Sequence, residues 1–293
     1  MSRLQIRHDT VYSYSEPARF GPWRLMMRPL DSHAIRVVKA SLSMSPMGMT
    51  RWTYDAYGNC ICYFAPGAEA SELRVVNNLL IERFPAPLAP LELDDPVSMS
   101  PLVYSAADRA VLEPFIAPAT ADRDNAYLEW VRAQVGRPDE PVLEFLQRLN
   151  ETIHRNFSYG MRDEVGTQSP SQTVAQSAGT CRDFAWLMIE SLRRLGFATR
   201  FVTGYLHCPN QTIRGAGATH AWCEVFLPDL GWVEFDPTNG LAESASLIRV
   251  GATRTPEEAS PMDGVAYGGG TFTIKVEVDV DLVDENGQVL KAA

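Results

Sequence analysis

SAGTCRDFAWLMIESLRRLG, residues 177–196, marks the change from turn-forming residues to an amphipathic helix. Its apolar side chains recur at helical intervals, and Gly196 is well placed to end the helix. Cys181 precedes the helical run, which we expect to begin at about Arg182. Helix N-terminal amides favour negative charge, and a thiolate is the reactive form of cysteine. Cys181 is therefore a candidate nucleophile, and a buried structural cysteine is the alternative.

A second motif follows downstream in residues 218–238, ATHAWCEVFLPDLGWVEFDPT, where two strand-like runs flank a turn signal. His220 and Asp236 lie near the far ends of these runs. A hairpin centred on Pro228 would place them side by side, because antiparallel partners have residue numbers with a constant sum. The loop must then contain an odd number of residues, or a bulge, because an even loop puts the two side chains on opposite faces.

These residue types can form a nucleophilic triad. In such a site Asp236 accepts a hydrogen bond from one imidazole nitrogen of His220, and the other nitrogen faces Cys181. The amides at the helix start could also bind the oxyanion of a tetrahedral intermediate. The alternatives are a strand histidine bonded to a backbone carbonyl and an aspartate that serves an Asp-Pro turn.

The rest of the chain divides into two predicted domains. Residues 1–84 carry short strand-like runs separated by turn residues, which is typical of an antiparallel β-sandwich. Residues 85–101 contain five prolines and no periodicity, which indicates a linker. Residues 102–293 show helical patterns followed by strands, and residues 271–282 alternate strictly between apolar and polar side chains. The sequence therefore predicts an α+β second domain.

Composition excludes several classes of protein. The net charge of −10, with no basic run longer than two residues, argues against a nucleic-acid partner. No uncharged apolar stretch reaches the length of a membrane span, so we expect no membrane partner. The first residues lack the apolar core of a secretory signal, and the expected location is cytoplasmic. The oligomeric state stays open.

The five cysteines do not describe a disulfide framework, because their number is odd and their spacing is uneven. Cys60 and Cys62 have no second pair of ligands to complete a zinc site, so we interpret them as strand residues. Cys208 and Cys223 are interpreted as structural, and Cys223 is expected on the strand face opposite His220. No metal and no cofactor is expected.

Three segments carry a resemblance to a known family: GTCRDFAWL (179–187), THAWCEVFLPDLGWVEFDPT (219–238) and IHRNFSYG (153–160). They closely resemble the transglutaminase-like superfamily of papain-related cysteine enzymes. The first 84 residues, with YDAYGN, look like the β-sandwich of a bacterial branch of this superfamily. IRVGATRTPEEASPMDGVAYGGG (248–270) is similar to the tail of that branch. The resemblance covers nearly the whole chain.

The resemblance implies a papain-like core behind the N-terminal β-sandwich, with Cys181 as nucleophile, His220 as general base and then acid, and Asp236 as its orienting partner. Two positions depart from the family pattern. Members commonly carry Gln after the cysteine, where this chain has Arg182, and His where it has Trp186. Arg182 would add positive charge near the sulfur, and it leaves open the oxyanion role that the usual Gln could play.

Four further residues are candidates for substrate contact: Tyr159, Arg182, Asp183 and Trp222. For Tyr159 and Trp222 the alternative is core packing, and for Asp183 it is a favourable charge at the helix N-terminus. The expected function is thiol-dependent hydrolysis of a peptide or amide bond, through a thioester, in a peptide or protein substrate. Transglutamination, in which an amine replaces water, and a non-catalytic binding module are the alternatives. Bacterial members that look like proteases, and the lack of an EF-hand pattern, favour hydrolysis.

Overall fold

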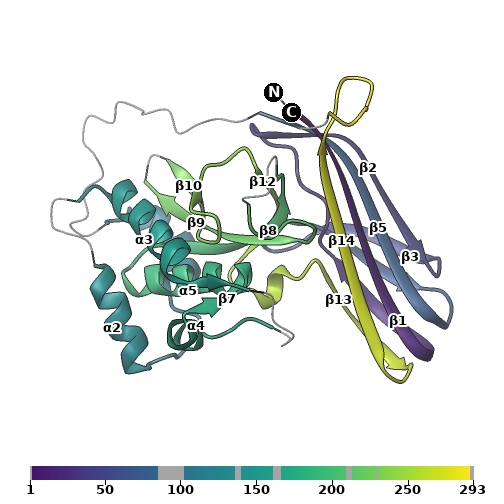
Figure 1. The fold of residues 1–293 in the computed structure, drawn as a ribbon, viewed down its shortest axis with the longest axis horizontal. Helices are drawn as coiled ribbons and strands as arrows, with labels where there is room; N and C mark the ends of the chain where they lie inside the picture. Colours follow the sequence, from purple (N-terminus) through teal and green to yellow (C-terminus); the bar gives the residue numbers. More distant parts are fainter. Residues whose placement is uncertain are drawn as a thin grey trace.

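The computed structural model describes residues 2–84, 102–135, 140–160, 166–208, 213–228 and 230–290. The predicted linker at 85–101 lies outside these residues. The described chain contains an antiparallel β region next to a core of helices and a second sheet (Figure 1). The predicted α+β class, with an N-terminal β region, is thus confirmed. No helix of the described part of the chain is long and apolar enough to cross a bilayer.

The N-terminal β region is one seven-stranded sheet in the order β2-β5-β1-β4-β3, with two more strands paired to β1. Its strands are β1 (Ser2–Leu25), β2 (Ile35–Ser45), β3 (Gly48–Tyr54), β4 (Cys60–Pro66), β5 (Ala70–Arg83), β13 (Met262–Gly268) and β14 (Phe272–Leu282). The long β1 runs through both halves of the sheet, and its pairing with β5 shifts register between Ser13 and Ala18. The expected sandwich is therefore formed by one continuous sheet. The half with β2 and β5 and the half with β3 and β4 share a small apolar core that includes Trp23, Phe64 and Val75.

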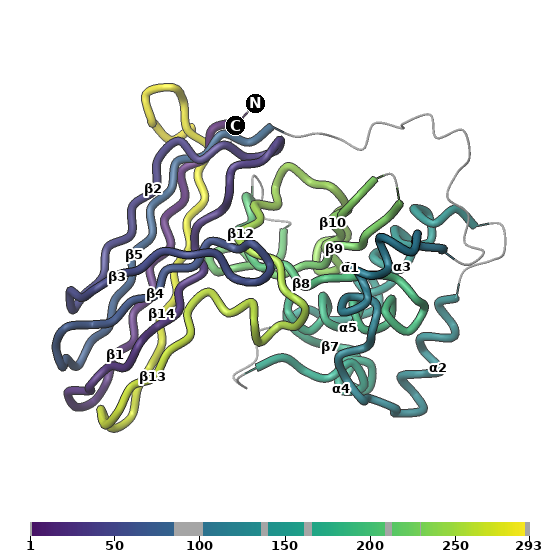
Figure 2. Tube along the Cα trace, turned by 180° about the vertical axis from the view of Figure 1, so that it is seen from behind, coloured from purple at the N-terminus to yellow at the C-terminus, as the bar shows by residue number. Residues whose placement is uncertain are grey.

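The last two strands join the sheet of the first residues (Figure 2). The strand predicted at 271–282 is present as β14, but it pairs with β1, from Leu4 opposite Leu282 to Tyr14 opposite Phe272. Strict alternation fixes which face of a strand is apolar, and it does not identify the neighbouring strand. The C-terminal part of the predicted second domain therefore contributes to the N-terminal sheet.

The core contains a five-stranded antiparallel sheet in the order β11-β10-β9-β8-β12, with helices packed against it. The helices are α1 (Ala106–Ile116), α2 (Asn125–Gln134), α3 (Val142–Asn156), α4 (Pro170–Gln176) and α5 (Cys181–Arg194). The strands are β8 (Thr199–Leu206), β9 (His220–Leu227), β10 (Gly231–Asp236), β11 (Leu241–Ala242) and β12 (Leu247–Thr253). A short parallel pair, β6 (Ser158–Tyr159) and β7 (Ala178–Gly179), and a 3-10 turn, η1 (Glu257–Ala259), complete it.

Helix α5 is the central helix of the core. It begins at Cys181 and ends at Arg194, two residues before Gly196, whose φ of 89° suits the left-handed stop predicted there. Both of its faces are buried, since all of its residues except Arg182 and Arg194 are buried. Even Glu190 and Arg193, which form an ion pair at 3.0 Å, have fully buried side chains. Packing on all sides of α5 therefore fixes the position of its first residue, Cys181.

The two parts of the molecule meet at buried polar contacts. Tyr205 of β8 donates its hydroxyl to the carbonyl of Met27 at 3.1 Å and accepts from Asn77 of β5 at 3.2 Å. Asn59 donates to the carbonyl of Ala252 at 2.9 Å and accepts from its amide at 2.9 Å. Because the buried side chains of Tyr205, Asn77 and Asn59 are hydrogen-bonded across this contact, they fix the sheet against the core.

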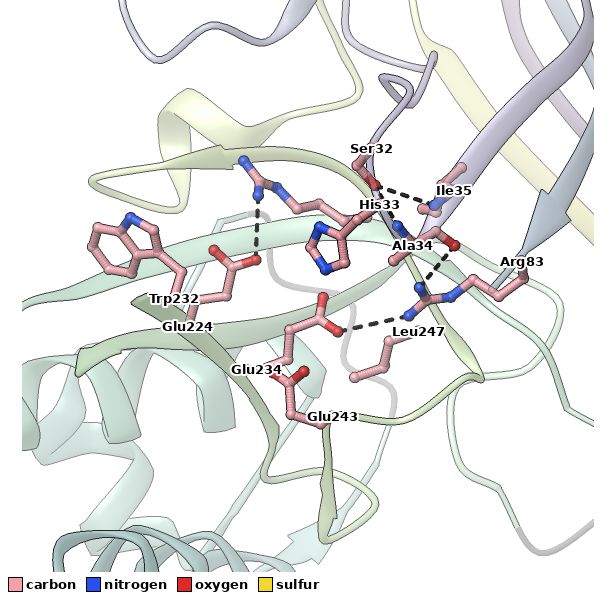
Figure 3. Close-up of a pocket in the computed structure, with 11 residues that line it drawn as sticks. Ser32, His33, Ala34, Ile35, Arg83, Glu224, Trp232, Glu234, Glu243 and Leu247 are labelled. Carbon is pink, nitrogen blue, oxygen red and sulfur yellow. Dashed lines mark hydrogen bonds and ion pairs between the residues drawn. The ribbon is translucent and has the colours of Figure 1, made fainter. Parts of the chain in front are cut away.

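A small cavity of about 150 Å³ lies at a second contact between the two parts (Figure 3). Arg83 of β5 reaches into it, and Nη2 of Arg83 lies 4.0 Å from Oε2 of Glu234 on β10. Burial, together with the charges of Glu224 and Glu243, raises the pKa of Glu234 to about 8, against the opposing effect of Arg83. The Glu234 carboxyl is therefore largely protonated at neutral pH.

This raised pKa predicts a loss of stability with rising pH. A group whose pKa is higher in the folded state stabilises the fold below its unfolded pKa and loses that contribution as pH rises to the folded value. Thermal unfolding between pH 5 and pH 9 should show this loss, and Glu234→Gln should reduce it, by on the order of 4 kcal/mol at pH 8. Glu72→Gln, at an exposed position of β5, is the matched control. An unchanged pH dependence in Glu234→Gln would contradict the assignment.

Candidate active site

Cys181 is the first residue of α5, and a buried carboxylate fixes this helix start. Asp183 accepts hydrogen bonds from the backbone N of Thr180 at 2.8 Å and from its hydroxyl at 2.9 Å. It also accepts from the backbone N of Gln168 at 2.7 Å. Gly179 is required here, since a Cβ would lie 2.8 Å from that of Asp183. Cys181 is left 9% exposed, at the edge of a cleft.

The hairpin that carries His220 and Asp236 turns one residue later than predicted. Leu227 pairs with Gly231 and Cys223 pairs with Phe235, so the register is centred on position 229 rather than on Pro228. The number of residues between the paired ends is odd, as predicted, and the two side chains therefore share a face. They are diagonal neighbours, a spacing that long side chains can bridge.

His220 and Asp236 form a buried pair. Nε2 of His220 lies 2.9 Å from Oδ2 of Asp236, and neither side chain is exposed to solvent. Asp236 also accepts from the backbone N of Thr238 at 2.9 Å and from Nδ2 of Asn239 at 2.8 Å. Burial lowers the imidazole pKa, but the Asp236 carboxylate outweighs it and raises the pKa of His220 to about 10. Burial opposes ionisation of Asp236, and His220 reverses this, so the pKa of Asp236 is lowered.

The other ring nitrogen of His220 is Nδ1, and His220 lines the same cleft as Cys181. Nδ1 is buried, and among the described residues it has no hydrogen-bond partner of good geometry. Cys181 nevertheless lies close enough to raise the pKa of His220 through hydrogen bonding and charge. Loose contacts of this kind are common before a substrate binds. Gly215, with a φ of 91°, packs against Nδ1, where a Cβ would approach to 3.0 Å. The structure thus brings Cys181, His220 and Asp236 together.

Cys181 and His220 line a cleft of about 490 Å³ between the core and the C-terminal strands. Its remaining walls come from the core and the C-terminal segment: Tyr159, Gly166, Thr167, Thr180, Arg182, Phe201, Thr203, Ala218, Thr219, Ala221, Pro256, Glu257, Ala259, Ser260, Pro261 and Val276. Two of the four secondary candidates, Tyr159 and Arg182, are therefore in the cleft.

The other two secondary candidates do not line the cleft. Asp183 is fully buried under the helix start. Trp222 is fully buried on β9, and its Nε1 donates to Glu234 at 3.2 Å. Its ring stacks on that of His220 with centroids 6.0 Å apart, so it supports the imidazole from behind.

Tyr159 supplies a hydroxyl to the cleft. Its β6 strand pairs with β7, with Tyr159 opposite Gly179, which places the ring beside the start of α5. Burial, followed by the charges of Cys181 and Asp236, raises the pKa of Tyr159 to about 12. The phenol therefore remains a hydrogen-bond donor throughout the neutral range.

Sequence reasoning missed Asn239, which links the pair to a loop. Its side chain donates to Asp236, as well as to the carbonyl of Arg214 at 3.2 Å. Its Oδ1 accepts from the backbone N of Arg214 at 2.7 Å, and this holds Gly215 against His220. The Asp-Pro-Thr-Asn sequence signals a turn, but it does not reveal which loop the asparagine binds.

None of the remaining cysteines lines the cleft. Cys60 and Cys62 are buried on β4, and Cys208 is half-buried. Cys223 is fully buried on β9, its sulfur donates to the carbonyl of Phe235, and burial raises its thiol pKa well above the usual range. Among the described residues, no cluster of three or more His, Cys, Asp or Glu side chains is arranged to hold a metal ion.

Comparisons with known proteins agree with this geometry. Residues 129–237 match the model of the transglutaminase-like superfamily, and residues 4–82 match that of the bacterial transglutaminase-like N-terminal region. An uncharacterized protein of Mycobacterium tuberculosis is 28% identical over 99% of this chain and 95% of its own length. A protein-glutamine gamma-glutamyltransferase of Pseudomonas aeruginosa is 28% identical over 41% of this chain and 19% of its own length.

The fold is shared with a solved structure over nearly its whole length. The crystal structure of a candidate cysteine protease from Cytophaga hutchinsonii superposes with a TM-score of 0.73 at 16% identity, over 98% of this chain and 93% of that one. The family expected from the motifs around Cys181 and His220 is confirmed. The chain belongs to the transglutaminase-like superfamily and carries the bacterial N-terminal region of that superfamily.

Proposed function

We propose that the protein is a thiol-dependent acyl-transfer enzyme that hydrolyses a peptide or amide bond. The observation that carries this proposal is the position of His220, between the buried Asp236 carboxylate and Cys181 at the edge of an open cleft. Such a histidine can hold a proton next to the sulfur and pass it on, which is the requirement of thiol acyl transfer.

The first half of the reaction forms a thioester. With a pKa of about 10, His220 is protonated at neutral pH, and its positive charge stabilises a thiolate on Cys181. The sulfur attacks the carbonyl carbon, and the electron pair of the C=O bond moves to the oxygen. When this tetrahedral intermediate collapses, the C–N bond breaks and His220 gives its proton to the departing amine.

The second half releases the acyl group. Now neutral, His220 takes a proton from water, the hydroxide attacks the thioester, and the C–S bond breaks. The acid leaves, and the thiolate and imidazolium are restored. Asp236 keeps the imidazole in the required orientation throughout, because its carboxylate occupies Nε2 and leaves Nδ1 to exchange the proton.

Water and a primary amine compete for the same thioester. The Cytophaga structure, described as a candidate cysteine protease, supports hydrolysis. The Pseudomonas relative, named as a gamma-glutamyltransferase, supports transamidation as the second candidate. The charged side chains of Arg182 and Glu257, which line part of the cleft and attract water, support water as the acceptor.

A peptide library in ¹⁸O-water, with and without a primary amine, tests the proposal by mass spectrometry. Hydrolysis predicts new C-termini that contain ¹⁸O, and the amine adduct remains a minor product. A dominant amine adduct on glutamine side chains, formed with loss of ammonia, would establish the transglutaminase instead. If iodoacetamide labels Cys60, Cys208 or Cys223 in preference to Cys181, and no product forms, the protein is a binding module and the proposal fails.

A further inference from the structure

Strand β14 has one free edge beside the active-site cleft. It pairs with β1 on one side, and among the described residues no strand pairs with its other side. The backbone N of Val278 donates to the carbonyl of Gly217 at 3.0 Å, in the loop that precedes His220. Residue 278 therefore directs its backbone groups away from β1, towards the core.

Every second residue of β14 directs its backbone groups to the same side as Val278. In an antiparallel pair, the N–H and C=O of one residue point to the same side, and neighbouring residues point to opposite sides. Phe272, Ile274 and Val276 therefore direct their backbone groups to the free edge, as Val278 does. The bond from the backbone N of Val283 to the carbonyl of Arg3, at 2.9 Å, confirms that odd-numbered residues face β1.

The side chains of these three residues form an apolar row that continues out of the cleft. Val276 lines the cleft that holds Cys181. Ile274 and Phe272 follow it along the strand and are 51% and 56% exposed. Figure 1 shows β14 at the side of the sheet that faces the core, with its start extending beyond the core. A polypeptide that reaches Cys181 past Val276 would lie along this row.

We propose that residues 272–276 of β14 bind an extended segment of the substrate as an added strand. This inference rests on the proposed function and names its substrate class, an extended chain with apolar side chains at alternate positions. Strand addition uses unpaired main-chain groups for affinity and alternate side-chain contacts for selectivity. The occupant follows from continuity with the cleft, because a chain paired here leads to the sulfur.

The length of the free edge determines the expected increase in reaction rate. Five residues of strand span roughly 14 Å, so the edge can pair with a segment of about five or six residues. Exposed hydrogen bonds each contribute modestly, and several together should accelerate the reaction of a substrate at least about tenfold. Compounds too short to reach Ile274 should lack this gain.

Alkylation of Cys181 measures the gain without knowledge of the natural substrate. One pair of probes is chloroacetamide and an N-chloroacetyl hexapeptide of alternating Val and Thr. The other pair is acetyl-valine chloromethyl ketone and the same hexapeptide ending in a chloromethyl ketone. In each case the sulfur displaces chloride and forms a C–S bond. We expect one hexapeptide to alkylate Cys181 at least about tenfold faster than its short counterpart, and the identity of that probe gives the strand direction.

Two changes test whether main-chain pairing causes the gain. N-methylation of the probe should abolish it at alternate positions only, because every second N–H faces the strand. Ile274→Pro removes an N–H that points away from β1 and should bring the ratio of the two rates near one, while the rate with the short probe is unchanged. Ile274→Thr keeps the N–H and should retain most of the gain.

The outcomes separate the two proposals. If the short probes alkylate Cys181 and neither hexapeptide is faster, or if N-methylation has no alternating effect, strand addition is overturned and the proposed function stands. If no probe alkylates Cys181, both are overturned. The N-methyl series uses the wild-type protein, so it remains decisive even if Ile274→Pro does not fold.

Discussion

Replacing Cys181 with alanine is expected to lower the rate of peptide hydrolysis by at least about 10⁴-fold, because the thioester can no longer form. The cleft and the His220–Asp236 pair do not depend on the thiol, so binding of a peptide should persist. Intact-mass measurements during turnover should show an acyl adduct on the wild-type chain and none on Cys181→Ala. Single-turnover kinetics on a library-derived peptide give the rate.

Cys208→Ala is the matched control for this loss. Cys208 is half-buried, lies two residues after the end of β8 and does not line the cleft, so its removal should change the hydrolysis rate less than about twofold. Cys181→Ala with more than a tenth of wild-type activity would show that another group is the nucleophile. An unfolded Cys181→Ala would show in the thermal unfolding curve.

Asp236→Asn should have the second largest effect, a fall in kcat of about 10²- to 10⁴-fold. The change keeps the size of the side chain and removes the charge that raises the pKa of His220 to about 10. Burial, which lowers that pKa, then dominates. We therefore expect the alkaline limb of the kcat/KM profile to move from near pH 10 to below neutral pH. An unchanged limb would show that another group controls it.

The same pair predicts a pH dependence of stability. The pKa of His220 is raised in the folded state, so its contribution is complete below about pH 6.5 and is lost as pH rises to about 10. The pKa of Asp236 is lowered, so its contribution is present at neutral pH and is lost in acid. Asp236→Asn should flatten the alkaline decline in denaturant unfolding. Asp279→Asn, at an exposed position of β14, should not.

The sequence predicted the common face of His220 and Asp236 correctly and placed the turn one residue too early. Whether His220 and Asp236 share a face depends on whether the number of loop residues is odd or even. The triad requires an odd number. The centre of the turn depends on which backbone groups pair last, and a Pro-Asp-Leu-Gly run allows several choices. The motif therefore predicts the face and leaves the register to tertiary structure.

Sequence patterns do not predict two other features of the structure. Glu190 and Arg193 lie on a helix whose apolar stripe indicated an amphipathic helix, yet both are buried as an ion pair. Their burial depends on α1 and the segment after it, where the backbone N atoms of Ala119 and Thr120 donate to Glu190. Similarly, the role of Asn239 depends on Arg214, which is distant in sequence. Partners contributed by other segments leave no periodic signal.

The pairing of β14 with β1 has a consequence for the order in which the protein becomes active during synthesis. Cys181, His220 and Asp236 leave the ribosome before residues 256–282, which supply one wall of the cleft. Strand β1 is synthesised long before its partner β14, because Leu4 pairs with Leu282. A nascent chain therefore carries Cys181 before it carries a finished cleft. Under the proposed function, we expect activity to begin only when the last strands have paired with the first.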